Sequence, residues 1–185
     1  RGVPVTAAQE WAGSFPGLLH PYPVLVGLVS LSMFTLHGAL WLRLKSEGAL
    51  EARMARWVPR LWGAFVATYA LATAASLLEA PHLFAGVLAN PLFLALTAAV
   101  VASIAAIPVL SRRGAAGGAF LASSAAIVSM ILVAAVSMFP RLVPSSIDPA
   151  YDLTVHNASS SPRTLAVMRG RRRVVASMTA ALLGA

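Results

Sequence analysis

The sequence contains no cysteine, which excludes disulfide bonds, thiolate catalysis and iron–sulfur ligation by this chain. It is also poor in charge, since 11% of its 185 residues are charged and 58% are hydrophobic. Soluble domains are about 25% charged and roughly 45–50% apolar. A domain of this size exposes too much surface to hide such an excess in a core. We therefore expect an integral membrane protein of the all-α class.

The middles of the apolar runs lack Asp, Glu, Lys and Arg. Proton pumps and ion-coupled transporters usually need such groups within the membrane, so the sequence argues against a self-contained transporter. Glu79 lies at the end of an apolar run, where a solvated helix cap is the simplest interpretation. Gly-rich phosphate-binding loops and nucleophile–base pairs are missing as well, and we assign no catalytic residue.

Four apolar runs are each long enough to cross a bilayer, which takes about 20 residues in a helix. They predict a bundle of four transmembrane helices over residues 23–42, 61–78, 91–110 and 115–138. Between the first two runs, residues 43–60 form the most charged loop, in which residues 47–56 could form a short surface helix. Pro108 lies in the last turn of the third run and could kink that helix.

The net charge of +8 would suit nucleic-acid binding, but the basic residues cluster in short loops between apolar runs. Such clusters are typical of the cytoplasmic loops of membrane proteins. Two loops hold seven of these residues: Arg43, Lys45, Arg53, Arg56, Arg60, Arg112 and Arg113. The segments on the other side hold three: Arg1, Arg141 and Arg163. This bias predicts that both ends of the four-helix unit lie outside the cytoplasm.

The same pattern divides the chain into four parts. Residues 1–22 and 139–163 would be extracytoplasmic loops, which precede and follow in the sequence a membrane bundle at residues 23–138. Three aromatic residues of the first loop suit the membrane surface: Trp11, Phe15 and Tyr22. Residues 164–185 begin like a fifth helix, but the four arginines within residues 169–173 would each cost about 2.5–3.5 kcal/mol near a bilayer centre. We therefore expect an incomplete fifth helix with a basic tail.

Histidine is the remaining residue type that could ligate a metal or haem. The four histidines lack metal-ligand spacing: His20, His37, His82 and His156. Only His37 lies inside a predicted span. A hydrogen-bonded packing residue is the main interpretation of His37, while a polar contact to a quinone or lipid headgroup and a haem-related role stay open. We assign no metal-binding or cofactor-binding residue.

The longest polar segment is residues 139–162, which is rich in proline and serine. Its residue types favour turns and caps, so we expect an ordered loop with Asp148 and Asp152 as turn formers. The triplet Asn157-Ala158-Ser159 matches a glycosylation acceptor pattern, but a polar turn is the simpler interpretation.

Several motifs are more specific than this composition. The polar loop holds Met138-Phe139-Pro140-Arg141, Pro144-Ser145-Ser146, Asp148-Pro149-Ala150-Tyr151, Leu153-Thr154 and Asn157-Ala158-Ser159-Ser160-Ser161-Pro162. Other segments hold Leu18-Leu19-His20-Pro21-Tyr22-Pro23, Leu36-His37-Gly38-Ala39, Leu44-Lys45-Ser46-Glu47-Gly48, Thr164-Leu165 and Val167-Met168. Together these motifs resemble the second half of subunit II of cytochrome bd-type quinol oxidases, over residues 17–168.

The resemblance implies a bacterial inner-membrane complex of the aerobic electron transport chain, which oxidises quinol and reduces dioxygen to water. In that family the b- and d-type haems and the quinol-oxidising loop belong to subunit I, and subunit II is its structural partner. This chain would then be the C-terminal half of a supporting subunit, bound to subunit I and membrane lipid, with no haem of its own. Some members also hold a structural quinone, which the resemblance does not place on these residues.

Two features depart from the family pattern. The chain starts at the family's midpoint without a methionine, and the residues from Arg169 onward do not resemble an apolar final helix. We expect a truncated or frameshifted piece of a longer protein. Two rival interpretations stay open, namely a polytopic membrane transporter and a non-functional remnant.

Overall fold

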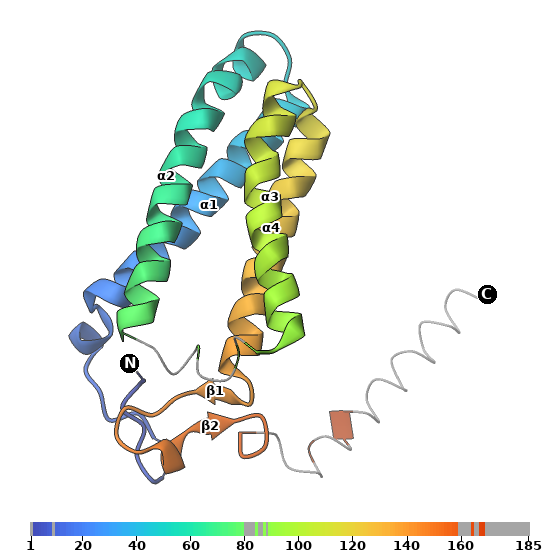
Figure 1. Ribbon diagram of the computed structural model, residues 1–185. Coiled ribbons are helices and arrows are strands. Elements are labelled where there is room, and N and C mark those ends of the chain that lie inside the picture. Colours follow the sequence, from blue (N-terminus) through green and yellow to red (C-terminus); the bar gives the residue numbers. More distant parts are fainter. Residues whose placement is uncertain are drawn as a thin grey trace, which may run out of the picture.

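Four long helices make up most of the protein (Figure 1). The computed structural model describes residues 2–8, 10–79, 84, 87, 89–158, 164 and 167–168. The helices are α1 (Pro21–Lys45), α2 (Ala49–Glu79), α3 (Pro91–Arg112) and α4 (Ala116–Met138). Each is long and apolar enough to cross a membrane, which confirms the predicted all-α membrane class. The basic tail from Arg169 and the incomplete fifth helix lie outside the described residues, apart from residues 167–168 and 164.

The helices pack as two antiparallel pairs, α1 with α2 and α3 with α4, and the pairs meet mainly where α1 contacts α4 (Figure 1). Large side chains from α1, α2 and α3 fill the centre, among them Leu36, Phe65 and Ile107. The α4 side of this core consists largely of small residues, including Ala119 and Ala126. Small side chains let helices approach closely in lipid, where packing rather than the hydrophobic effect drives association.

The charged segment between the first two spans is mostly helical, and this corrects our expectation of a loop. Helix α2 begins at Ala49 and runs through the predicted surface helix and the second span without a break. Residues 49–58 are mostly Ala, Leu, Glu, Arg and Met, which are strong helix formers, and Pro59 removes only one backbone donor. The connection is therefore limited to residues 46–48, where Gly48 adopts a left-handed conformation with φ of 63°.

Short elements gather at one end of the bundle. They are a 3-10 helix η1 (Phe15–Leu18), strand β1 (Arg141–Val143), a 3-10 helix η3 (Pro149–Tyr151) and strand β2 (Leu153–Thr154). Strands β1 and β2 pair antiparallel, and Val3 forms a parallel bridge with Ser145 beside them. The N-terminal segment and the polar loop thus form one layer over the starts of α1 and α3 and the ends of α2 and α4 (Figure 1). We call this layer, residues 2–8, 10–20 and 139–158, the cap.

The cap lies at the opposite end of the bundle from the basic connections at residues 43–53 and 112–113 (Figure 1). This arrangement agrees with the topology that the charge bias predicts, in which both ends of the four-helix unit lie on the same side. The prediction that the cap faces outward stays a prediction.

Candidate functional site

His37, the histidine inside a span, joins α1 to α4. Its Nδ1 lies 2.7 Å from the hydroxyl of Ser123, and its ring stacks on Phe120 with 4.6 Å between ring centroids. The Ser123 hydroxyl donates its proton to the Phe120 carbonyl at 2.7 Å. Since a serine has one hydroxyl proton, its oxygen accepts at His37, which places the histidine proton on Nδ1. These contacts support the packing interpretation of His37.

The His37 contact continues along α1 toward the basic end of the bundle. One turn later the Trp41 ring lies 5.1 Å from Phe120, and the Lys45 ammonium lies 5.1 Å above the Trp41 ring. Tryptophan and lysine at the end of a span are the anchors expected where a helix leaves the bilayer. The α1–α4 contact therefore changes from a polar pair inside the bundle to an interfacial aromatic pair at its end.

Arg43 has a structural role that the sequence analysis missed. Its Nη1 donates to the Ser111 carbonyl at 3.2 Å and also to the Ser111 hydroxyl, and its Nε lies 3.6 Å from the Glu51 carboxylate. The side chain is 12% exposed. Ser111 lies in the last turn of α3, where the helix dipole favours a cation. A residue that we read only as an orientation signal thus joins α1, α2 and α3.

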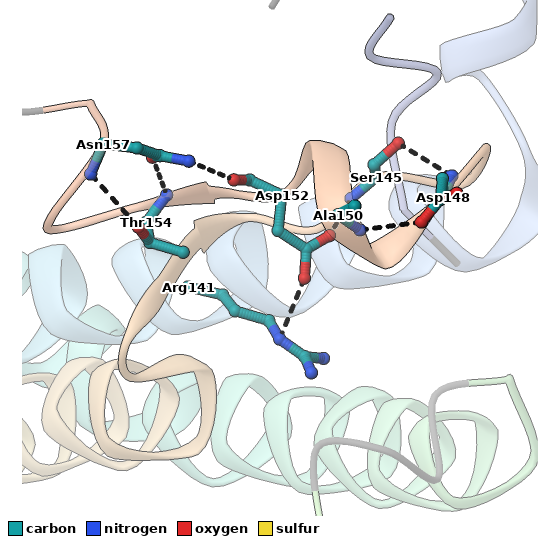
Figure 2. A network of polar contacts seen from close by, with 7 residues as sticks. All are labelled: Arg141, Ser145, Asp148, Ala150, Asp152, Thr154 and Asn157. Carbon is teal, nitrogen blue, oxygen red and sulfur yellow. Dashed lines mark hydrogen bonds and ion pairs between the residues drawn. The ribbon is translucent and has the colours of Figure 1, made fainter. Parts of the chain in front are cut away.

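Asp152 organises the cap (Figure 2). One carboxylate oxygen accepts from the Ser145 backbone N–H at 2.7 Å, and the other pairs with Arg141 Nε at 2.9 Å. Its own carbonyl accepts from the Asn157 side-chain amide at 2.8 Å. Asp152 is 6% exposed, so its role is wider than the turn formation that we expected. Asp148 does act as a turn former, because its carboxylate accepts from Ala150 N at 2.8 Å at the start of η3.

Asn157 closes the turn after β2 with both ends of its side-chain amide. Its oxygen accepts from the Thr154 N–H at 2.6 Å while its nitrogen donates to Asp152 (Figure 2). These bonds support the polar-turn interpretation of the Asn157 triplet, whose last member Ser159 lies outside the described residues.

The N-terminal segment is the part of the cap that sequence reasoning did not foresee. Val3 N donates to the Pro144 carbonyl at 2.9 Å, and its carbonyl accepts from Ser146 N at 3.0 Å. Val5 is 4% exposed, which makes it part of the core. A Cβ added at Gly2 would lie 2.3 Å from the Pro144 carbonyl oxygen, so only glycine allows this approach. Glycine at position 2 was the sequence feature that could have indicated this close contact.

The cap motifs belong to a known family. Residues 1–181 match the family model described as cytochrome bd terminal oxidase subunit II. The chain belongs to the cytochrome bd oxidase subunit II family. The match is wider than the range 17–168 that we expected, and it includes most of the basic tail that we expected to depart from the family. Together with the four candidate spans, this membership makes the chain part of a multi-pass membrane protein.

Two relatives support the bd oxidase assignment. A Haemophilus influenzae protein described as probable cytochrome oxidase subunit 2 is 31% identical over 85% of this chain and 48% of its own length. A Bacillus subtilis protein described as cytochrome bd ubiquinol oxidase subunit 2 is 28% identical over 91% of this chain and 49% of its own length. The chain therefore spans about half the length of either relative.

The remaining candidate residues that the structure describes are spread over different parts of the chain. His20 and Glu79 line one open hollow of about 660 Å³ between the cap and the helix ends, while His156 is exposed in the turn after β2. His82 lies outside the described residues. Within the described ranges, no three His, Asp or Glu side chains gather in a metal-binding arrangement. Glu79 is the last residue of α2 and is exposed, as expected for a position at the end of a span.

Proposed function

We propose that this chain is the supporting half of subunit II in a terminal oxidase that oxidises quinol and reduces dioxygen to water. The observation that carries the proposal is the family match over residues 1–181. The Bacillus subtilis relative is described as a subunit of a ubiquinol oxidase, which supports quinol as the electron donor of the complex. In this proposal the haems b and d and the quinol-oxidising site belong to subunit I, in a bacterial plasma membrane.

The polar groups of the bundle favour support over catalysis. His37 is committed to Ser123 and Phe120, and Arg43 is committed to Ser111 and Glu51. The other polar side chains within the spans mostly bond back to their own helix or to a neighbouring hydroxyl, as Ser32 does with Thr68 at 2.9 Å. Polar groups satisfied by helix contacts hold a bundle together and leave few groups for a substrate.

We further propose that the cap faces the extracytoplasmic side, with the bundle at residues 23–138 crossing the membrane beneath it. The basic connections at the other end then face the cytoplasm, as basic loops of membrane proteins usually do. The cap would hold the outer ends of α1 and α4 together, because its hydrogen bonds link the segment before α1 to the segment after α4.

The proposal is tested by expressing the complete operon and purifying through a tag on the complete subunit II. We expect b- and d-type haems to co-purify and to be visible in the absorption spectrum. The variant His37→Gln should keep the full haem spectrum, with Ser123→Ala as the matched partner variant. A stable, haem-free subunit II would contradict the oxidase proposal and favour transport. Loss of haem in the His37→Gln variant alone, with the complex still assembled, would contradict the packing role of His37.

A further inference from the structure

A groove opens between α2 and α3 at the basic end of the bundle. These two helices contact each other much less than the α1–α2 and α3–α4 pairs do. The groove has a volume of about 600 Å³, and its lining comes from residues 58–62 of α2, the last turns of α3 and the turn that follows. The lining residues are Val58, Pro59, Trp62, Pro108, Val109, Ser111, Arg112 and Arg113.

The walls of this groove are apolar and rigid. Pro59 and Pro108 line it from the two helices, and the Trp62 ring lines it as well, with its N–H bonded to the Ile104 carbonyl at 3.0 Å. Because that N–H is already bonded to α3, the ring offers the groove mainly its carbon surface. Val109 is 47% exposed and adds an aliphatic wall. Such a surface fits a hydrocarbon chain better than a polar ligand.

The rim of the groove carries two positive charges. Arg112 and Arg113 are both exposed, and among the described residues no carboxylate pairs with either of them. The neighbouring Arg43 already holds Glu51, so that carboxylate does not neutralise the rim. Two guanidinium groups side by side form a preferred site for phosphate, which they can bind with two parallel hydrogen bonds each.

We propose that this groove holds an anionic phospholipid, with its phosphate at Arg112 and Arg113 and an acyl chain along Pro59, Trp62 and Val109. Charge complementarity argues for this occupant, because a basic rim above an apolar wall matches an anionic headgroup above its chain. The position agrees as well under the orientation proposed above, since basic pockets between transmembrane helices at the cytoplasmic surface are typical sites for such lipids. The lipid would fill the gap where α2 and α3 make few contacts and would hold their ends together.

The test uses the complete oxidase complex, purified in mild detergent and reconstituted in phosphatidylcholine with or without phosphatidylglycerol. Native mass spectrometry counts the lipids that stay bound. The wild-type complex should retain about one phosphatidylglycerol. The variant Arg112→Gln/Arg113→Gln should retain at least roughly tenfold less, because loss of even one charge-assisted hydrogen bond to phosphate costs about tenfold in affinity. The lysine pair Arg112→Lys/Arg113→Lys should restore much of the binding, and Arg53→Gln/Arg56→Gln controls for basic charge at the same end.

A second variant addresses the apolar wall without touching the charges. Val109→Trp should fill the groove and displace the lipid while leaving Arg112 and Arg113 in place. The haem spectrum reports assembly in every sample, so loss of the complex is distinguished from loss of the lipid. Equal phosphatidylglycerol retention in the wild type, the glutamine pair and Val109→Trp would overturn the proposal, and would indicate a groove filled by another helix of the complex.

Discussion

The indole N–H of Trp62 on α2 donates to the Ile104 carbonyl on α3 at 3.0 Å. Ile104 lies four residues before Pro108, and a proline has no N–H to donate to the carbonyl four residues earlier. Trp62 therefore supplies, from the neighbouring helix, the hydrogen bond that Pro108 removes from α3. In a membrane this matters because lipid offers no substitute donor, and prolines in spans are tolerated where a neighbouring helix satisfies the freed carbonyl.

The first prediction concerns this bond. Trp62→Phe keeps an aromatic ring but removes the donor, and should destabilise the bundle by about 0.6–1.7 kcal/mol, the range for hydrogen bonds between membrane helices. The loss should shrink in a Pro108→Ala background, where the restored backbone N–H gives the Ile104 carbonyl a donor within α3. Unfolding of the complete complex by detergent titration measures both values. Trp57→Phe, at a tryptophan that is 51% exposed on the same helix, is the matched control.

The second prediction concerns Arg43. Arg43→Gln removes a charge-assisted hydrogen bond to Ser111 and the ion pair with Glu51. Because the side chain is largely buried, we expect a loss of about 1–3 kcal/mol in the free energy of unfolding. Arg53→Gln removes the same charge at an exposed position of α2 and should change stability by less than about 0.5 kcal/mol. Equal losses in the two variants would show that Arg43 acts only through net charge.

The third prediction concerns the cap. Asp152→Ala leaves the Ser145 N–H and Arg141 without their partner, so the polar loop should open and become accessible to added protease. Asp148→Ala removes only the bond to Ala150 and should cost about 1 kcal/mol locally, as for loss of a helix cap. Limited proteolysis of the complex in intact spheroplasts measures the rate of cleavage within residues 139–158. Faster cleavage in Asp148→Ala than in Asp152→Ala would contradict the central role of Asp152.

The spans could be located from the sequence because a bilayer imposes a length of apolar residues that few other structures require. The ends of the helices were less certain. The short surface helix expected at residues 47–56 and the span expected at 61–78 are one helix, α2, because the strong helix formers before Pro59 outweigh the loss of one hydrogen bond.

Some candidate residues could likewise be recognised from the sequence, and others could not. His37 was recognised because a histidine among uncharged residues is conspicuous, and its packing role was the first interpretation. Arg43 and Trp62 were not distinguished from the other basic and aromatic residues near the span ends. Their partners Ser111 and Ile104 lie 68 and 42 residues away in sequence and contribute backbone carbonyls, which leave no trace in residue type.

The sequence by itself determined that this chain lies in a membrane, where its four spans fall and which family it belongs to. Apolar length, charge distribution and the motifs of residues 138–162 are local properties, and each can be read along the chain. Only the tertiary structure decided that Val3 pairs with the polar loop at Ser145, that Arg43 joins three helices, and that α2 and α3 leave a basic-rimmed groove. These features depend on which backbone groups meet across the bundle, and that follows from the packing of whole helices.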